Sequence, residues 1–203
     1  MKPKLVFITF FISIFITCQR EEIELSGKEE LKIEIKEILS MEDRYKALLA
    51  FNALNPKGQA AYWKERLNFI IFSKNYSFEQ IKHINQLINR IDPLLYQNDI
   101  LALEEFYFFA EEWTISGLNL FEKEELFFIA FQIETKDYTV PIVDPGNGGG
   151  SGGYQPNCKC NKSSWAACYF GAHGDCVSSN CQSTNWGCGI IGTSQCDGEC
   201  RFT

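Results

Sequence analysis

Histidine and positive charge are scarce in this chain of 203 residues. The two histidines are His83 and His173, and 26 acidic against 19 basic side chains give a net charge of −7. No E-x-x-H pattern is present for a carboxylate metal site. Because an acidic chain repels phosphate groups, we expect no nucleic acid among its partners. No acid, base, nucleophile and metal ligands converge, so we predict no catalytic residue, no metal and no cofactor.

Cysteine is absent between Cys18 and Cys158, whereas residues 158 to 200 hold eight cysteines. An even number of cysteines in a short exported segment indicates a disulfide framework. We predict four disulfide bonds, and the sequence leaves about a hundred pairings open. Zinc is the rejected alternative, because the C-x2-C pairs of common zinc modules are missing. The cluster consists of Cys158, Cys160, Cys168, Cys176, Cys181, Cys188, Cys196 and Cys200.

The apolar run at the N-terminus is short. It extends from Leu5 to Thr17 after two lysines, and as a helix it would rise ~20 Å, less than the ~30 Å core of a bilayer. We interpret residues 1–17 as a signal peptide. The stretch from Phe15 to Cys18 resembles the lipobox of bacterial lipoproteins, which implies that Cys18 is lipidated and anchors the protein to a membrane. We therefore expect an exported outer-membrane or cell-surface lipoprotein; the alternative is a secreted protein.

Residues 23–134 carry the signals of successive helices. Ser77-x-x-Gln80 is a capping box, and Pro56 stands at a first helical position. Ser40 and Asn119 are further expected N-caps. The alternation at residues 31–35 leaves a strand as an alternative there, although helix is favoured. We expect about five helices that pack as a small bundle.

Two sets of side chains in the helical segment allow a structural or a functional interpretation. The aromatic residues are expected to form the core, with a ligand groove as the alternative. Glu104, Glu105, Glu111 and Glu112 are expected to form a solvated helix face, with a carboxylate metal site as the alternative. The aromatic residues concerned are Phe69, Phe72, Phe106, Phe108, Phe109, Trp113, Phe127, Phe128 and Phe131.

The composition changes after the helical segment. Residues 135–153 are extended and then glycine-rich, which is typical of a flexible linker. Residues 154–203 are too few for a large hydrophobic core, so disulfide bonds are expected to stabilise them. The fold class is thus a mainly α-helical bundle followed by a small disulfide-rich, loop-rich C-terminal module. We expect the two parts to fold independently.

The module has a recognisable frame of motifs. It opens with Cys158-Lys159-Cys160, carries Gly187-Cys188-Gly189 at its centre and closes with Cys196-Asp197-Gly198-Glu199-Cys200. With its eight cysteines, it resembles the exported proteins called bacteriocin fulvocin C-related, which are typical of Bacteroidota. The resemblance covers the module alone and implies an antibacterial activity.

Two functions follow as expectations. The first is an exported bacteriocin-like protein whose partner is a component of a bacterial envelope. In that reading Trp165, Trp186, Ile190 and Ile191 are exposed and bind or disturb the target. The second is a non-toxic cell-surface lipoprotein whose cysteine module binds a glycan or a protein. The sequence leaves the target, the disulfide pairing and the role of the helices open.

Overall fold

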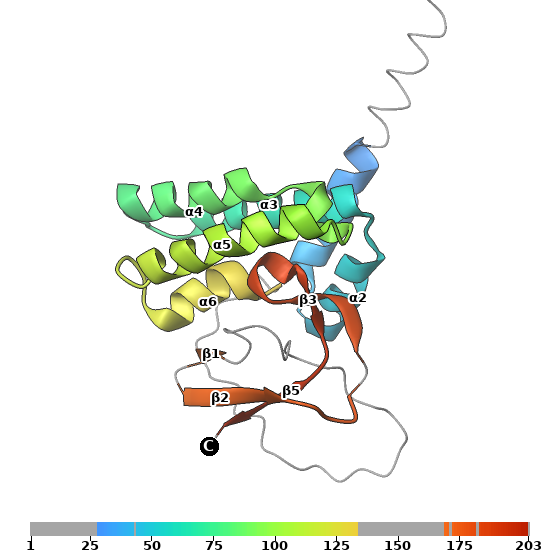
Figure 1. Ribbon diagram of the computed structural model, residues 1–203. Coiled ribbons are helices and arrows are strands. Elements are labelled where there is room, and N and C mark those ends of the chain that lie inside the picture. The colour runs from blue at the N-terminus through green and yellow to red at the C-terminus, as the bar shows by residue number, and fades with distance from the viewer. Residues whose placement is uncertain (1–27, 43, 134–168, 171, 182, 203) are drawn as a thin grey trace, which may run out of the picture. The chain divides into compact units, whose positions relative to one another are not determined.

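The computed structural model describes residues 28–42, 44–133, 169–170, 172–181 and 183–202 (Figure 1). Residues 1–37 and 38–203 form two separate units, and the described part of the first is helical. The described part of the second unit is mainly helical, with a small strand region at its C-terminal end. This class was predicted from the sequence. The alternation at residues 31–35 does not produce a strand, because residues 28 to 40 are helical.

Local hydrogen bonds mark where the helices of the second unit begin. The Asn55 side chain accepts a backbone N–H at the start of α3. Ser77 and Gln80 form the predicted capping box of α4, with bonds of 3.2 and 2.9 Å. The Asp99 carboxylate caps α5 by accepting the backbone N–H of Ala102 at 3.0 Å. The elements are α2 (Arg44–Ala53), α3 (Pro56–Ser73), α4 (Phe78–Arg90), the 3-10 helix η1 (Pro93–Tyr96), α5 (Ile100–Gly117) and α6 (Lys123–Phe131).

Two predicted N-caps are wrong. Ser40 is itself the last helical residue of its stretch rather than the residue before a new helix. Asn119 lies in a turn, where the N–H groups of Leu120 and Phe121 both donate to the Gly117 carbonyl oxygen at 2.9 Å. This turn delays the next helix, so α6 takes Glu122 as its N-cap.

Arg66 is the charged residue at the centre of the helical part. It is fully buried on α3, and its guanidinium donates to the carbonyl oxygens of Phe128, Ile129 and Ile133 at 2.6, 2.7 and 3.2 Å. The carbonyls of Phe128 and Ile129 belong to the last turn of α6, where a positive charge is favourable, and Ile133 follows that helix. The guanidinium also stacks at 5.0 Å over the Trp63 ring. Arg66 therefore fixes α6 against α3.

The strand region contains two small antiparallel sheets. One has the strand order β1-β2-β5, and in its register Cys176 stands opposite Cys200. The other is the pair β3-β4, with the 3-10 helix η2 in the connection between them. The bounds are β1 (Tyr169–Phe170), β2 (Ala172–Val177), β3 (Thr184–Cys188), η2 (Ile190–Gly192), β4 (Ser194–Cys196) and β5 (Glu199–Phe202).

Strand β3 and helix η2 pack into the helical core. The Tyr96 hydroxyl on η1 donates to the carbonyl oxygen of Ile191 at 2.9 Å, and Ile191 is 0% exposed. Asn52 on α2 exchanges two bonds with the Trp186 backbone, at 3.0 and 3.1 Å. At Gly187, with φ of 108°, a Cβ would lie 2.0 Å from Leu48 Cδ1. Glycine is therefore needed for this close approach.

This packing joins the two parts that were expected to fold independently. Ile38–Thr203 form one compact unit. The reason is chemical: β3 and η2 supply buried apolar side chains and backbone groups whose hydrogen-bond partners lie on the helices. The predicted linker, residues 135–153, lies outside the described residues.

Candidate functional site: a groove between helix α5 and the cysteine module

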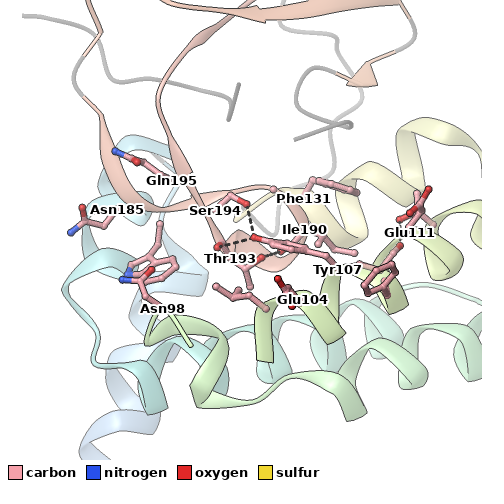
Figure 2. A pocket seen from close by; sticks show the side chains of 16 residues that line it. Asn98, Glu104, Tyr107, Glu111, Phe131, Asn185, Ile190, Thr193, Ser194 and Gln195 are labelled. Carbon is pink, nitrogen blue, oxygen red and sulfur yellow. Dashed lines mark hydrogen bonds between the residues drawn. The ribbon is translucent and has the colours of Figure 1, made fainter. Parts of the chain in front are cut away.

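A groove of about 780 Å³ lies between α5 and the segment that runs from β3 through η2 to β4 (Figure 2). Its size falls within the range of ligand-binding pockets, roughly 300–1,000 Å³. Both the helical part and the cysteine module contribute walls. The lining residues are Asn98, Leu103, Glu104, Tyr107, Phe108, Ala110, Glu111, Thr114, Phe131, Asn185, Trp186, Gly189, Ile190, Thr193, Ser194 and Gln195.

One face of α5 forms the helical wall. The lining residues from Leu103 to Thr114 recur every three or four positions, which places them on one side of a helix. This face extends about 16 Å along the axis at 1.5 Å per residue. The site is therefore an elongated groove. Phe108 is 75% exposed within it, and Tyr107 is 41% exposed.

The opposite wall is closed by a disulfide bond. Cys188 at the end of β3 is bonded to Cys196 at the end of β4, with the two Cα atoms 5.1 Å apart. The residues between them, from Gly189 to Gln195, supply five lining positions. Gly189 has φ of 71°, and a Cβ there would lie 2.5 Å from Ser194 Oγ. The disulfide and this glycine together shape the wall.

Tyr107 connects the two walls. Its hydroxyl lies 3.1 Å from Ser194 Oγ and donates to the carbonyl oxygen of Thr193 at 3.4 Å. Figure 2 shows the side chain reaching from α5 to the module segment. The phenol ring thus forms part of the floor of the groove, and its hydroxyl holds the two walls at a set distance.

The polar groups of the groove are amides, hydroxyls and carboxylates. In the view of Figure 2, Asn98, Asn185 and Gln195 lie toward one end and Glu111 toward the other, with Glu104 between them. No Lys, Arg, His or Cys occurs among the described residues that line it. The lining therefore offers hydrogen bonds, aromatic surface and negative charge, and no nucleophile beside a base.

The predicted binding residues of the module fall in different places. Trp186 and Ile190 line the groove, but Ile190 is only 6% exposed and Ile191 is 0% exposed. The expectation that these two isoleucines are exposed is wrong, because η2 inserts them between the module and the helices. Trp186 is half-buried, with its ring 6.0 Å from that of Tyr96. Trp165 lies outside the described residues.

The disulfide bond expected in the module is present as Cys188–Cys196. Cys176 and Cys181 are disulfide-bonded as well. Side chains outside the described set are those of Cys18, Cys158, Cys160, Cys168 and Cys200.

The aromatic residues expected in the core divide among core, groove and exposed surface. Phe69 and Phe72 are 50% and 87% exposed and do not line the groove, so the core expectation is wrong for them. The buried face of α3 runs instead through Trp63, Arg66 and Ile70. Phe106, Trp113, Phe127 and Phe128 are buried, as the core interpretation predicted. Phe108 and Phe131 line the groove. The other α5 residues of the groove wall were missed as ligand contacts, because a helix face shows which positions share a side and not what faces them. The exposed Glu104 and Glu111, seven positions apart, were the available signal.

His83 belongs to the core and lies outside the groove. It is 5% exposed on α4 and stacks on Trp113, with ring centroids 4.6 Å apart. Burial lowers the pKa of its imidazole, and a backbone hydrogen bond involving Trp113 acts in the opposite direction. Within the described ranges, no group of three His, Cys, Asp or Glu residues could hold a metal ion. No helix in that part of the chain is long and apolar enough to cross a membrane.

The chain matches no protein-family model, no curated protein and no solved structure.

Proposed function

We propose that this is an exported binding protein of the bacterial cell envelope that holds an elongated ligand in the groove along α5. The observation that carries the proposal is the joint construction of that groove. The Cys188–Cys196 disulfide closes the wall opposite α5. A disulfide at this position suits an oxidising compartment outside the cytoplasm. In this proposal the helices form a bundle that acts as a rigid platform for the module.

Binding suits the lining better than catalysis. A catalytic site needs a nucleophile or a general base within hydrogen-bond reach of a second group that activates it. The hydroxyls of Ser194 and Tyr107 pair with each other, and the carboxylates lie two helical turns apart on α5. Exposed aromatic rings beside amides and carboxylates provide contact area and orientation, which are the requirements of recognition. The anchor at Cys18 would keep this site at the envelope.

An antibacterial function is the second candidate. The observation that favours it is the cysteine pattern, which resembles that of the bacteriocin fulvocin C-related proteins. The burial of Ile190 and Ile191 removes two of the four side chains that were expected to contact a target envelope. An antibacterial form of this protein would therefore act through the groove, or through a module released from the helices.

The test uses the protein purified in its exported, oxidised form. Its retention on bacterial cells is measured beside the survival of those cells. The variant is Phe108→Ala, which removes an aromatic ring that is 75% exposed in the groove. The control is Phe78→Ala on α4, which removes an equally exposed ring outside the groove.

We expect the parent and Phe78→Ala to be retained without killing, and Phe108→Ala to be retained at least about tenfold less. A loss of this size corresponds to about 1.4 kcal/mol of binding free energy. Killing of competing bacteria by both variants alike would favour the antibacterial candidate. Equal retention of the two variants would show that the groove is not the binding site.

A further inference from the structure

We propose that the ligand of the groove is a basic amphipathic peptide segment, carried by a partner protein and bound along α5. The inference rests on the proposed binding function and adds the chemical class of the ligand. Three features of the described residues lead to it: the length of the groove, its exposed aromatic surface and its uncompensated negative charge.

The length and the aromatic surface favour a chain over a small molecule. The α5 wall from Leu103 to Thr114 spans about 16 Å, equal to about three turns of a helix. Phe108 and Tyr107 present exposed rings in the middle of that wall. Apolar side chains spaced three, four and seven positions apart on a partner helix would meet these rings in succession.

The charge favours a basic ligand. Glu104 and Glu111 both line the groove, and seven positions on a helix separate them by about 10 Å. No ion pair joins either carboxylate to another described residue. The neighbouring Glu105 and Glu112 add two more negative charges on the same helix, which contains no basic residue. A cationic side chain entering this groove would therefore find carboxylates without a partner.

The spacing of the two carboxylates selects a helical arrangement of the cations. Lysine or arginine residues seven positions apart on a partner helix are also separated by about 10 Å. Such a helix could place one cation beside Glu104 and the other beside Glu111, with an apolar residue between them on Phe108. The same carboxylates repel an anionic lipid surface or an acidic peptide. A neutral oligosaccharide would gain nothing from them.

The experiment measures the affinity of the full exported protein for three probes. The first is a synthetic helical peptide of about 18 residues, long enough to cover the groove, with leucines on one face and lysines seven positions apart. The second is the same peptide with glutamate in place of lysine. The third is chitohexaose, a neutral oligosaccharide. Fluorescence anisotropy of labelled probes, in low and in physiological salt, gives the dissociation constants.

Two double variants form a matched pair. Glu104→Gln with Glu111→Gln removes the two carboxylates that line the groove. Glu105→Gln with Glu112→Gln removes two carboxylates of the same helix, also seven positions apart, that do not line it. Both pairs change the net charge equally and affect exposed side chains, so neither is expected to unfold the protein.

We expect the lysine peptide to bind at least about tenfold more tightly than the glutamate peptide, and less tightly as salt rises. The groove pair should weaken its binding about four- to twenty-fivefold, because exposed ion pairs contribute about two- to fivefold each. The control pair should weaken it by less than about twofold.

Equal affinities for the two peptides, or equal losses in the two double variants, would overturn the inference. Binding of chitohexaose without binding of the lysine peptide would replace it with a glycan ligand. If Phe108→Ala abolishes retention on cells while the lysine peptide fails to bind, the binding function stands and only the ligand class is wrong. If retention is also independent of Phe108, both proposals fall.

Discussion

The docking of the module on the helices can be tested by removing one oxygen atom. Tyr96 is 3% exposed, and its hydroxyl donates to the carbonyl oxygen of the fully buried Ile191. Tyr96→Phe keeps the ring and its edge contacts with Phe51 and Trp186, whose centroids lie 6.1 and 6.0 Å away. The substitution therefore isolates the hydrogen bond.

The magnitude follows from leaving a buried carbonyl without its donor, which costs about 1–3 kcal/mol. In a cooperative unit of this size each kcal/mol lowers the melting temperature by about 2–4 °C. At the middle of the energy range, about 2 kcal/mol, we expect Tyr96→Phe to melt about 4–8 °C below the parent. The readout is the helical circular dichroism signal. Burial also raises the pKa of the Tyr96 phenol well above its ordinary value. The hydroxyl thus remains protonated, and its contribution to stability is present, throughout the neutral range.

Tyr107→Phe is the matched control, because it removes the same atom from a hydroxyl at the half-exposed floor of the groove. Water can replace that bond, so its melting temperature should fall by no more than about 2 °C. If Tyr96→Phe melts like the parent, the bond between η1 and η2 does not hold the module. If the helical signal is unchanged while the module comes apart, the two parts fold independently after all.

Three further outcomes follow from the fold. Arg66→Met should lower the free energy of unfolding in urea by about 2–6 kcal/mol, because the buried carbonyls of Phe128 and Ile129 lose the Arg66 donor at about 1–3 kcal/mol each. The exposed Lys64→Met on the same helix should change it little, and equal effects would contradict the role of Arg66. The lowered pKa of His83 means that the imidazole prefers to be neutral in the folded state. Its contribution to stability is therefore present above the unfolded pKa of about 6.5 and is lost as the pH falls through the folded value, by at most about 1.4 kcal/mol per pH unit. The urea midpoint should fall more between about pH 7.5 and pH 5 in the parent than in His83→Leu, and parallel curves would exclude this titration. Replacing Cys188 and Cys196 together by serine should reduce stability by about 2–3 kcal/mol, the expected effect of a short closed loop, and should abolish retention on cells. Full retention in that variant would show that the disulfide does not shape the groove wall.

Local signals in the sequence predicted much of the helical part. The capping box at Ser77 and Gln80 marks the start of α4, and Asn55 with Pro56 marks the start of α3. Such signals act between neighbours along the chain, so they can be read without knowledge of the fold. The prediction of Asn119 as an N-cap failed, because the chain continues after α5 as a backbone turn and the next helix begins later.

The density of cysteines predicted a disulfide in the C-terminal segment, because a short segment with little hydrophobic core usually needs such bonds. The partners of each cysteine depend on distances that a spacing pattern does not contain. The same limit applies to Ile190 and Ile191. Their hydrophobicity indicated a contact surface, but whether that surface faced a target or the protein's own helices was open.

What the sequence determined by itself was composition and local order: an acidic helical segment, a cysteine-rich end and the caps between helices. What only the tertiary structure decided was which surfaces meet. Tyr96 and Ile191 stand far apart in the chain, as do Asn52 and Trp186. The sequence around each of these residues contains no signal that identifies its hydrogen-bond partner. The groove arises from the same long-range packing, because one wall is a helix face and the other a disulfide-closed connection. Pairings of this kind depend on the fit of buried surfaces, which no short window of sequence can show.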